Sequence, residues 1–223
     1  MDGVRTILLH ENVLADIKKD ADVLRNELKE KGIYLVNVMS SPGSGKTTML
    51  VNLINRLKNR YKIGVMEADI DSDVDAVTVA KKTGVPSIQL HTGGMCHLDS
   101  DMTRQGLSNM KKGDYDLIFI ENVGNLVCPA EFDAGAHENI CILSVPEGTD
   151  KPLKYPLMFT VCDLVVISKC DVAKVFNYDF KAVETFIHER NPKAEIIRIS
   201  AKTGEGMDEL ASHFEKKIDG FKK

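Results

Sequence analysis

Hydrophobic positions follow two different periodicities along this chain. Most segments between the short apolar runs carry apolar residues at three- and four-residue steps, which is typical of helices. The runs themselves have the length and composition of buried strands. They cover residues 33–39, 62–67, 86–90, 116–121, 140–145, 163–168 and 195–199. Repeated strand-helix units predict an α/β fold, built on a mostly parallel, doubly wound sheet with flanking helices.

An amphipathic helix is predicted before the first strand, over residues 10–31. Gly32 would end it. Its apolar positions are Val13, Leu14, Ile17, Ala21, Leu24 and Leu28. Because no Pro- or Ser-rich linker divides the rest of the chain, we expect an N-terminal helical extension over 1–32 and one domain over 33–223.

Composition and charge narrow the class of protein. The 223 residues are 43% hydrophobic and 28% charged, with a net charge of −4 and no basic run, so neither nucleic acid nor an anionic membrane is an expected partner. No apolar stretch is long enough for a membrane helix and no signal peptide opens the chain, so we expect a cytoplasmic protein. Its five scattered cysteines favour core filler or metal ligands over disulfides.

A phosphate-binding loop follows the first predicted strand. The residues that would contact a nucleotide are Gly43, Ser44, Gly45, Lys46, Thr47 and Thr48, and a helical pattern follows them. Glycines let backbone N–H groups face an anion, Lys46 would reach the β- and γ-phosphates, and the Thr47 hydroxyl would ligate Mg²⁺. Ser40 stands where this motif usually begins with glycine. A P-loop NTPase is therefore predicted.

Two further strand ends offer groups for magnesium and for the attacking water. Asp69 and Ser72 follow the second strand, and Glu121 lies at the tip of the fourth, with Gly124 just beyond it. An acid at the end of an apolar strand is costly as a core residue, which favours a role for Glu121 at the magnesium site. Lys46, Asp69 and Glu121 are the expected catalytic residues.

Guanine recognition is predicted from two late motifs. Ser168-Lys169-Cys170-Asp171 matches the Asn-Lys-x-Asp pattern except that Ser168 replaces Asn, and Asp171 can accept the N1–H and N2–H₂ donors of guanine. After the last strand, the backbone of Ser200, Ala201 and Lys202 suits the guanine O6 acceptor. Their order behind a phosphate loop favours GTP over ATP.

Cysteine and histidine occur together in two loops that should leave the same edge of the sheet. Cys96 and His97 follow the third strand and Cys128 follows the fourth, a set that suits Zn²⁺ or Ni²⁺ but is one ligand short of a closed tetrahedral site. The spacing is equally compatible with a structural role, in which the two cysteines are small buried hydrophobic residues and the histidine is hydrogen-bonded within the protein. The other cysteines, Cys141, Cys162 and Cys170, are expected in the core. The other histidines, His10, His91, His137, His188 and His213, are expected to be structural or exposed.

Four motifs together closely resemble the HypB family, GTPases that help insert nickel into [NiFe]-hydrogenase. They are Ser41-Pro42-Gly43-Ser44-Gly45-Lys46-Thr47-Thr48, Gly93-Gly94-Met95-Cys96-His97-Leu98, Glu121-Asn122-Val123-Gly124-Asn125-Leu126-Val127-Cys128-Pro129 and Asp150-Lys151-Pro152-Leu153-Lys154-Tyr155-Pro156. The resemblance spans residues 10–215. It implies a SIMIBI-class P-loop GTPase that forms a homodimer on binding GTP.

The resemblance also implies roles for particular residues. Cys96, His97 and Cys128 would bind Ni²⁺ or Zn²⁺ at the dimer interface, with Asp75 as an additional or coupling group. Asp69 and Glu121 would serve the Mg²⁺ and hydrolysis site. Lys151 or Lys154 would reach the nucleotide of the partner subunit. A HypA-type nickel carrier and a hydrogenase large-subunit precursor are the implied protein partners.

Departures from the family pattern limit these expectations. Before residue 40 the chain has neither a Cys-x-x-Cys-Gly-Cys motif nor a His-rich tract, so storage of several nickel ions is not expected. Ser168 lacks the amide that would tie the guanine motif to the phosphate loop, which predicts weaker nucleotide binding. The alternatives to hydrogenase maturation are a urease-type nickel maturation GTPase and a metal-buffering module without productive GTP hydrolysis.

Overall fold

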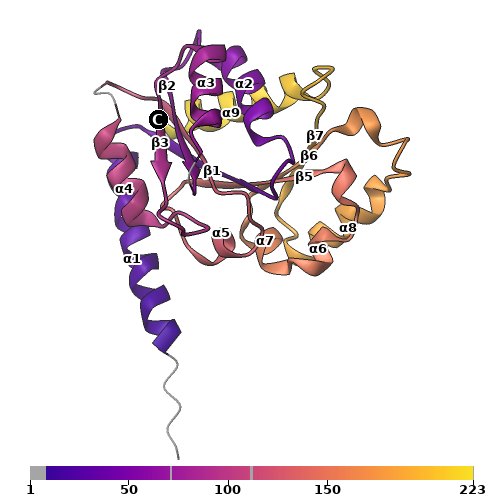
Figure 1. The fold of residues 1–223 in the computed structure, drawn as a ribbon, viewed down its shortest axis with the longest axis horizontal. Helices are drawn as coiled ribbons and strands as arrows, with labels where there is room; N and C mark the ends of the chain where they lie inside the picture. The colour runs from indigo at the N-terminus through magenta and orange to yellow at the C-terminus, as the bar shows by residue number, and fades with distance from the viewer. Residues whose placement is uncertain (1–8, 71, 111–112, 223) are drawn as a thin grey trace, which may run out of the picture.

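A seven-stranded parallel sheet forms the centre of the molecule (Figure 1). The computed structural model describes residues 9–70, 72–110 and 113–222, and of residues 9–18 only the backbone. The strands are β1 Tyr34–Ser40, β2 Ile63–Asp69, β3 Ser87–His91, β4 Leu117–Glu121, β5 Glu138–Ser144, β6 Leu164–Ser168 and β7 Glu195–Arg198. Every neighbouring pair of strands in the order β3-β2-β4-β1-β5-β6-β7 is parallel. The predicted fold class is confirmed, each strand beginning and ending within two residues of its apolar run.

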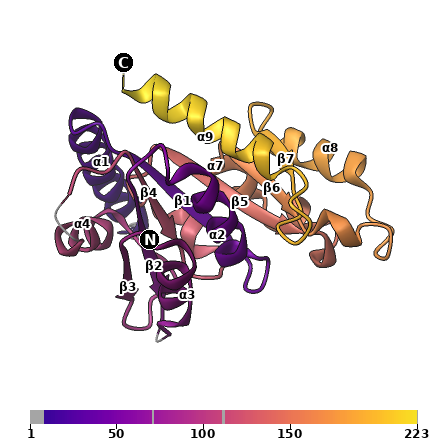
Figure 2. The ribbon, with the colours of Figure 1, turned by 90° about the horizontal axis from the view of Figure 1, so that it is seen from above.

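Helices cover both faces of the sheet (Figure 2). They are α1 Leu9–Glu30, α2 Lys46–Leu57, α3 Val74–Thr83, α4 Ser100–Asn109, α5 Cys128–Glu131, α6 Lys151–Lys154, α7 Pro156–Val161, α8 Phe180–Arg190 and α9 Met207–Phe221, with 3₁₀ turns η1 Val145–Glu147 and η2 Cys170–Val172. One face packs against α2, α3 and α9. The other packs against α1 and α4 at the β2 side and against α7 and α8 at the β6 side. Because both faces are covered, the inner strands consist mostly of buried apolar residues.

The strand order places the carboxyl end of β1 between those of β4 and β5. The chain continues from β1 to β2 on one side of this point and from β4 to β5 on the other, and such a switch in direction is where α/β sheets bind ligands. The phosphate loop, residues 40–47, begins there. The segments after β2, β3, β4, β6 and β7 emerge at the same edge, so the motifs found in the sequence all face one side of the molecule.

The second half of helix α1 packs into the core. Leu24 and Leu28 are buried in the cluster under α4, and Gly32, with φ of +68°, ends the helix as expected. The first half projects away from the body of the protein (Figure 1). The predicted extension also includes residues 1–8, which lie outside the described part of the chain. Within that part, none of the helices combines the length and apolar character needed to cross a bilayer.

Candidate functional site

The phosphate loop connects β1 to α2 with a backbone that glycine permits. Gly43 and Gly45 have φ of +74° and +101°, and Gly45 is the N-cap of α2. Side chains with a Cβ rarely adopt this conformation, so the two glycines allow the loop to present its N–H groups at the helix N-terminus. The buried Lys46 ammonium donates to Ser40 Oγ at 3.1 Å. Ser40 therefore fits the first position of the loop and contacts the predicted phosphate-binding lysine.

Two carboxyl groups meet behind the phosphate loop, at the end of β2 and β4. Thr47 Oγ1 donates to Glu121 Oε1 at 2.9 Å, which brings together two predicted magnesium ligands. Glu67 is the strand neighbour of Glu121. Both side chains are buried, and Glu67 Oε1 and Glu121 Oε2 have no hydrogen-bond partner within the described residues. Such orphaned oxygens beside a threonine hydroxyl are the donor set that Mg²⁺ prefers.

Glu67 is a site residue that the sequence analysis missed. Burial, reinforced by the charge of Glu121, raises its pKa well above the usual range. Burial also raises the pKa of Glu121, against the opposing charge of Lys46. The signal available in the sequence was an acid within the apolar run of β2, but only the register of β2 on β4 reveals that Glu67 faces Glu121.

The segment after β2 contains the other predicted acids. Asp69 Oδ1 accepts from the backbone N–H of Ser72 at 2.9 Å, which fixes the turn that leads to α3. Asp75 is exposed on the first turn of α3, and its charge acts on both Glu67 and Glu121. It is not among the residues that gather with Cys96. The structure thus associates Asp75 with the carboxyl pair rather than with the thiols.

The switch loop, residues 122–127 after β4, lies against the phosphate loop. At Gly124 a Cβ would be 3.0 Å from Pro42 Cγ and 3.1 Å from Pro42 Cα, so only glycine allows this approach without a shift. The buried Asn122 amide donates to Asn37 Oδ1 at 3.0 Å, anchoring the start of the loop to β1. A phosphate group bound in the phosphate loop would therefore lie close to Gly124, where it could affect the conformation of the switch loop.

The predicted guanine residues form a cavity of about 380 Å³ beside the phosphate loop. Asp171 Oδ1 accepts from Ser200 Oγ at 2.7 Å, which orients the carboxylate, and Lys169 Nζ donates to Gly43 O at 2.7 Å. The cavity is lined by Ser44, Gly45, Thr48, Lys169, Asp171, Ala201 and Lys202, together with Met49, Pro146, Ser168, Val172, Phe176 and Ile199. Phe176, half-exposed at the rim, was not expected from the sequence.

Ser168 corrects the expectation that the guanine motif has lost its connection to the phosphate loop. Its buried hydroxyl donates to Ser44 O at 2.7 Å. Ser168 is the last residue of β6, and its short side chain is long enough to reach this carbonyl. The connection between the two loops is present, made by a hydroxyl.

Cys96, His97 and Cys128 come together at the same edge of the sheet. One ligand atom from each lies within 4.8 Å of the others, and the two Sγ atoms are 2.6 Å apart. Burial lowers the pKa of His97, which favours the neutral imidazole that binds metals. Its Nδ1 is buried with no hydrogen-bond partner in the described chain. Two thiols and an imidazole with an unused nitrogen fit a borderline or soft divalent ion.

The remaining cysteines and histidines have structural surroundings. Cys141 and Cys162 are fully buried in the cluster under α7, and Cys170 Sγ donates to Ile167 O at 3.2 Å. His137, His188 and His213 each contact backbone or carboxyl oxygens, and His91 is exposed; the side chain of His10 lies outside the described residues.

Comparison with known proteins covers nearly the whole chain. Residues 34–198 match the family described as CobW/HypB/UreG, nucleotide-binding domain. The hydrogenase maturation factor HypB of Azotobacter vinelandii is 41% identical over 212 residues, which are 95% of this chain and 70% of that protein. The hydrogenase/urease maturation factor HypB of Helicobacter pylori is 41% identical over 219 residues, 94% of this chain and 89% of that protein.

A solved structure supports the same relation. The crystal structure of HypB from Helicobacter pylori in complex with nickel matches with a TM-score of 0.86 and 39% identity, covering 92% of this chain and 96% of that chain.

Proposed function

The chain belongs to the HypB family of hydrogenase maturation factors, and from this premise we propose that it is a GTP-hydrolysing metallochaperone that couples nucleotide state to nickel delivery. One observation carries the proposal: Glu121 and Cys128 directly flank one short segment, the switch loop, which lies against the phosphate loop at Gly124. A shift of this loop on GTP binding or hydrolysis would move a metal ligand directly.

GTP hydrolysis is supported by the groups around the phosphate loop. Mg²⁺, held by Thr47, Asp69, Ser72 and Glu121, would neutralise charge on the phosphate oxygens. Lys46 would bind the β- and γ-phosphates from its buried position. We propose that Asp69 and Glu121 orient the attacking water. Guanine would be selected by Asp171, oriented by Ser200, with the Lys169 stem against the ring.

Nickel is the proposed cargo of Cys96, His97 and Cys128. A Helicobacter pylori relative with 39% identity was crystallised with nickel, and the thiol and imidazole donors suit Ni²⁺ or Zn²⁺. Three protein ligands leave a coordination position for water or for a second subunit. Because the site requires free thiols, we expect the protein to act in the reducing cytoplasm.

A GTP-dependent homodimer would complete the site. The segments that surround it expose large apolar side chains to solvent: Ile70, Val74, Met95, Val127, Leu153 and Leu157. Exposed apolar residues of this size are typical of an interface. Lys154 pairs with Asp150 at 2.5 Å, whereas the Lys151 ammonium lies over the Tyr155 ring. We therefore favour Lys151 as the lysine that reaches the partner's nucleotide.

We propose the following order of events. GTP binding would close the dimer, with Mg²⁺ held by Thr47, Asp69, Ser72 and Glu121, closure would change the shared metal site, and hydrolysis would reset it. The metal would then pass from a HypA-type carrier toward a hydrogenase large-subunit precursor. Urease is the second candidate client, because the Helicobacter pylori relative is named as a hydrogenase/urease maturation factor. Pull-down with each apo-enzyme system distinguishes the two clients.

Nickel transfer with Cys128→Ala tests the proposal. We expect this variant to lose GTP-dependent nickel transfer to an apo-acceptor while it binds GTP like the wild type, since Cys128 does not line the guanine cavity. Thr47→Val should do the reverse, keeping nickel binding but losing phosphate release. Unchanged transfer by Cys128→Ala would refute the coupling. Tight nickel binding without phosphate release by the wild type would instead support a metal-buffering module.

A further inference from the structure

The segments that carry the metal ligands both continue into structure that α1 contacts. Cys96 and His97 precede α4, whose cap is Asp99, and Cys128 begins α5. Residues 132–137 follow α5 and run back to β5 beside α1. The second half of α1 therefore lies against both segments, although it is distant from them in sequence.

Arg25 of α1 makes the most extensive of these contacts. Its Nη2 lies 2.9 and 2.8 Å from the two carboxylate oxygens of Asp133, and its Nε donates to Ala136 O at 2.8 Å. Nη1 contacts Asp22 on the same helix. The Arg25 and Asp133 side chains are 27% and 31% exposed, so the pair is shielded from solvent more than most surface ion pairs. A guanidinium bonded through all three nitrogens holds residues 133–136 at a defined place on α1.

Close packing supports the same placement. Gly135 has φ of +76°, and a Cβ there would lie 2.7 Å from Leu24 Cδ2, so glycine lets the segment approach the helix. Asp133 Oδ1 also accepts from the Gly135 N–H at 2.8 Å. His137 continues the contact, with Nε2 2.9 Å from Arg25 O.

The neighbour of Asp133 contacts a metal ligand. Phe132 stacks on His97 with ring centroids 3.7 Å apart and an interplanar angle of 11°. A chain of direct contacts thus runs from Arg25 to Asp133, through the adjoining Phe132, to the imidazole of His97. Stacking fixes the plane of the ring and hence the direction of its nitrogen lone pair.

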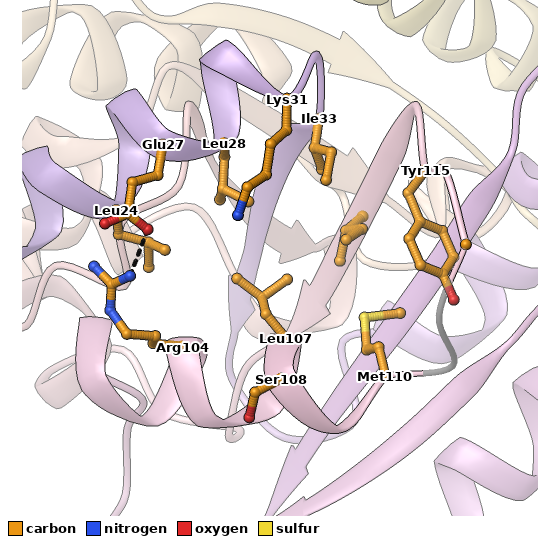
Figure 3. A pocket seen from close by; sticks show the side chains of 12 residues that line it. Leu24, Glu27, Leu28, Lys31, Ile33, Arg104, Leu107, Ser108, Met110 and Tyr115 are labelled. Carbon is orange, nitrogen blue, oxygen red and sulfur yellow. Dashed lines mark hydrogen bonds and ion pairs between the residues drawn. The ribbon is translucent and has the colours of Figure 1, made fainter.

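A second contact holds α4. Arg104 of α4 pairs with Glu27 of α1 at 2.5 Å across a cavity of about 300 Å³, lined mainly by apolar side chains such as Leu107 (Figure 3). The Arg104–Glu27 pair is thus a second link between α1 and the segment that continues from Cys96 and His97.

From these contacts we infer that Arg25 and Asp133 are positioning residues for the metal site, acting through the Phe132–His97 stack. The inference rests on the proposed nickel site and adds to it a dependence on α1. Neither residue offers a metal ligand itself. Groups that orient a ligand in this way typically contribute 10–100-fold to metal affinity.

Titration of the full-length protein with NiCl₂ tests the inference, with thiolate-to-nickel absorption as the readout. We expect Arg25→Ala to raise the nickel Kd about tenfold, within the range for orienting groups. Phe132→Leu, which keeps the α1 contact, should produce a similar loss. Arg25→Lys should bind nickel with an affinity between those of the wild type and Arg25→Ala, because it keeps the charge opposite Asp133. Affinity for GDP should be unchanged in all three.

Arg56→Ala is the matched control. Arg56 of α2 likewise makes an ion pair with a distant segment, at Asp208 of α9, and is 31% exposed, but it lies on the opposite face of the sheet. It should lower stability without altering nickel Kd. The inference is overturned if Arg25→Ala binds nickel within twofold of the wild type, or if Arg56→Ala weakens nickel binding equally. If the Cys96→Ala variant binds nickel as tightly as the wild type, the proposed metal site itself is overturned instead.

Discussion

Replacement of Ser168 by alanine removes the hydroxyl that connects the guanine motif to the phosphate loop. This hydroxyl is buried, and it donates to Ser44 O at 2.7 Å. The substitution deletes one oxygen and adds no atom, so it should not disturb the packing of β6. Any change in nucleotide binding can therefore be assigned to the lost hydrogen bond.

The expected effect follows from the worth of one buried hydrogen bond. Such a bond contributes about 1 kcal/mol net to stability, and its loss costs more where the carbonyl left without a partner is shielded from water. Without it the guanine motif is free to leave the phosphate loop, and nucleotide binding must restore the arrangement. A cost of about 1 kcal/mol corresponds to an approximately fivefold higher Kd for GDP.

Ser144→Ala provides the control for this prediction. Ser144 is the strand neighbour of Ser168, is equally buried, and its hydroxyl bonds to Glu147 at 2.7 Å instead of to the phosphate loop. Fluorescence titration with a labelled GDP should show weaker binding by Ser168→Ala alone, while both variants lose stability. Equal GDP affinity in wild type and Ser168→Ala would refute the idea that this hydroxyl holds the nucleotide pocket together.

Three further predictions concern the switch loop, α1 and the dimer. Gly124→Ala should slow GTP hydrolysis while leaving GDP affinity intact, since the added methyl meets Pro42 at 3.0 Å; an unchanged rate would contradict the proposed contact. Burial lowers the pKa of His137 to about 4, so the unfolded chain binds more protons below pH 6.5 and stability should fall from pH 6.5 toward 4, on the order of 2 kcal/mol. Urea unfolding of His137→Gln should show a shallower decline, and an identical one would refute this. Lys151→Met should reduce turnover at dimer-forming concentrations more than Lys154→Met does; the reverse order would favour Lys154.

Periodicity alone predicted the fold because the inner strands are buried on both faces. The runs around Val36, Phe119 and Val166 are mostly apolar, and proline or glycine follows the first two of them. Motif spacing also predicted which loops meet, since parallel strands deliver their carboxyl ends to one edge. The convergence of Cys96, His97 and Cys128 follows from that rule, and the structure brings them together.

Other parts of the site depend on register and side-chain direction, which periodicity does not specify. In the sequence Glu67 resembles an ordinary strand residue, and only the register of β2 on β4 pairs it with Glu121. The hydrogen bond from the Ser168 hydroxyl to Ser44 O depends on how close β6 comes to the phosphate loop, which the sequence does not specify. The Arg25–Asp133 contact joins residues more than a hundred positions apart, and no motif marks either of them.

Nickel affinity measured in two nucleotide states tests the central claim most directly. Purified protein is titrated with nickel in the presence of GDP or of a non-hydrolysable GTP analogue, with the mass of the particle recorded in the same samples. The account predicts that affinity and mass both change between the two states, and that Cys96→Ala abolishes the metal response. Equal nickel affinity in both states would mean that nucleotide and metal are not linked at equilibrium, and it would contradict the account.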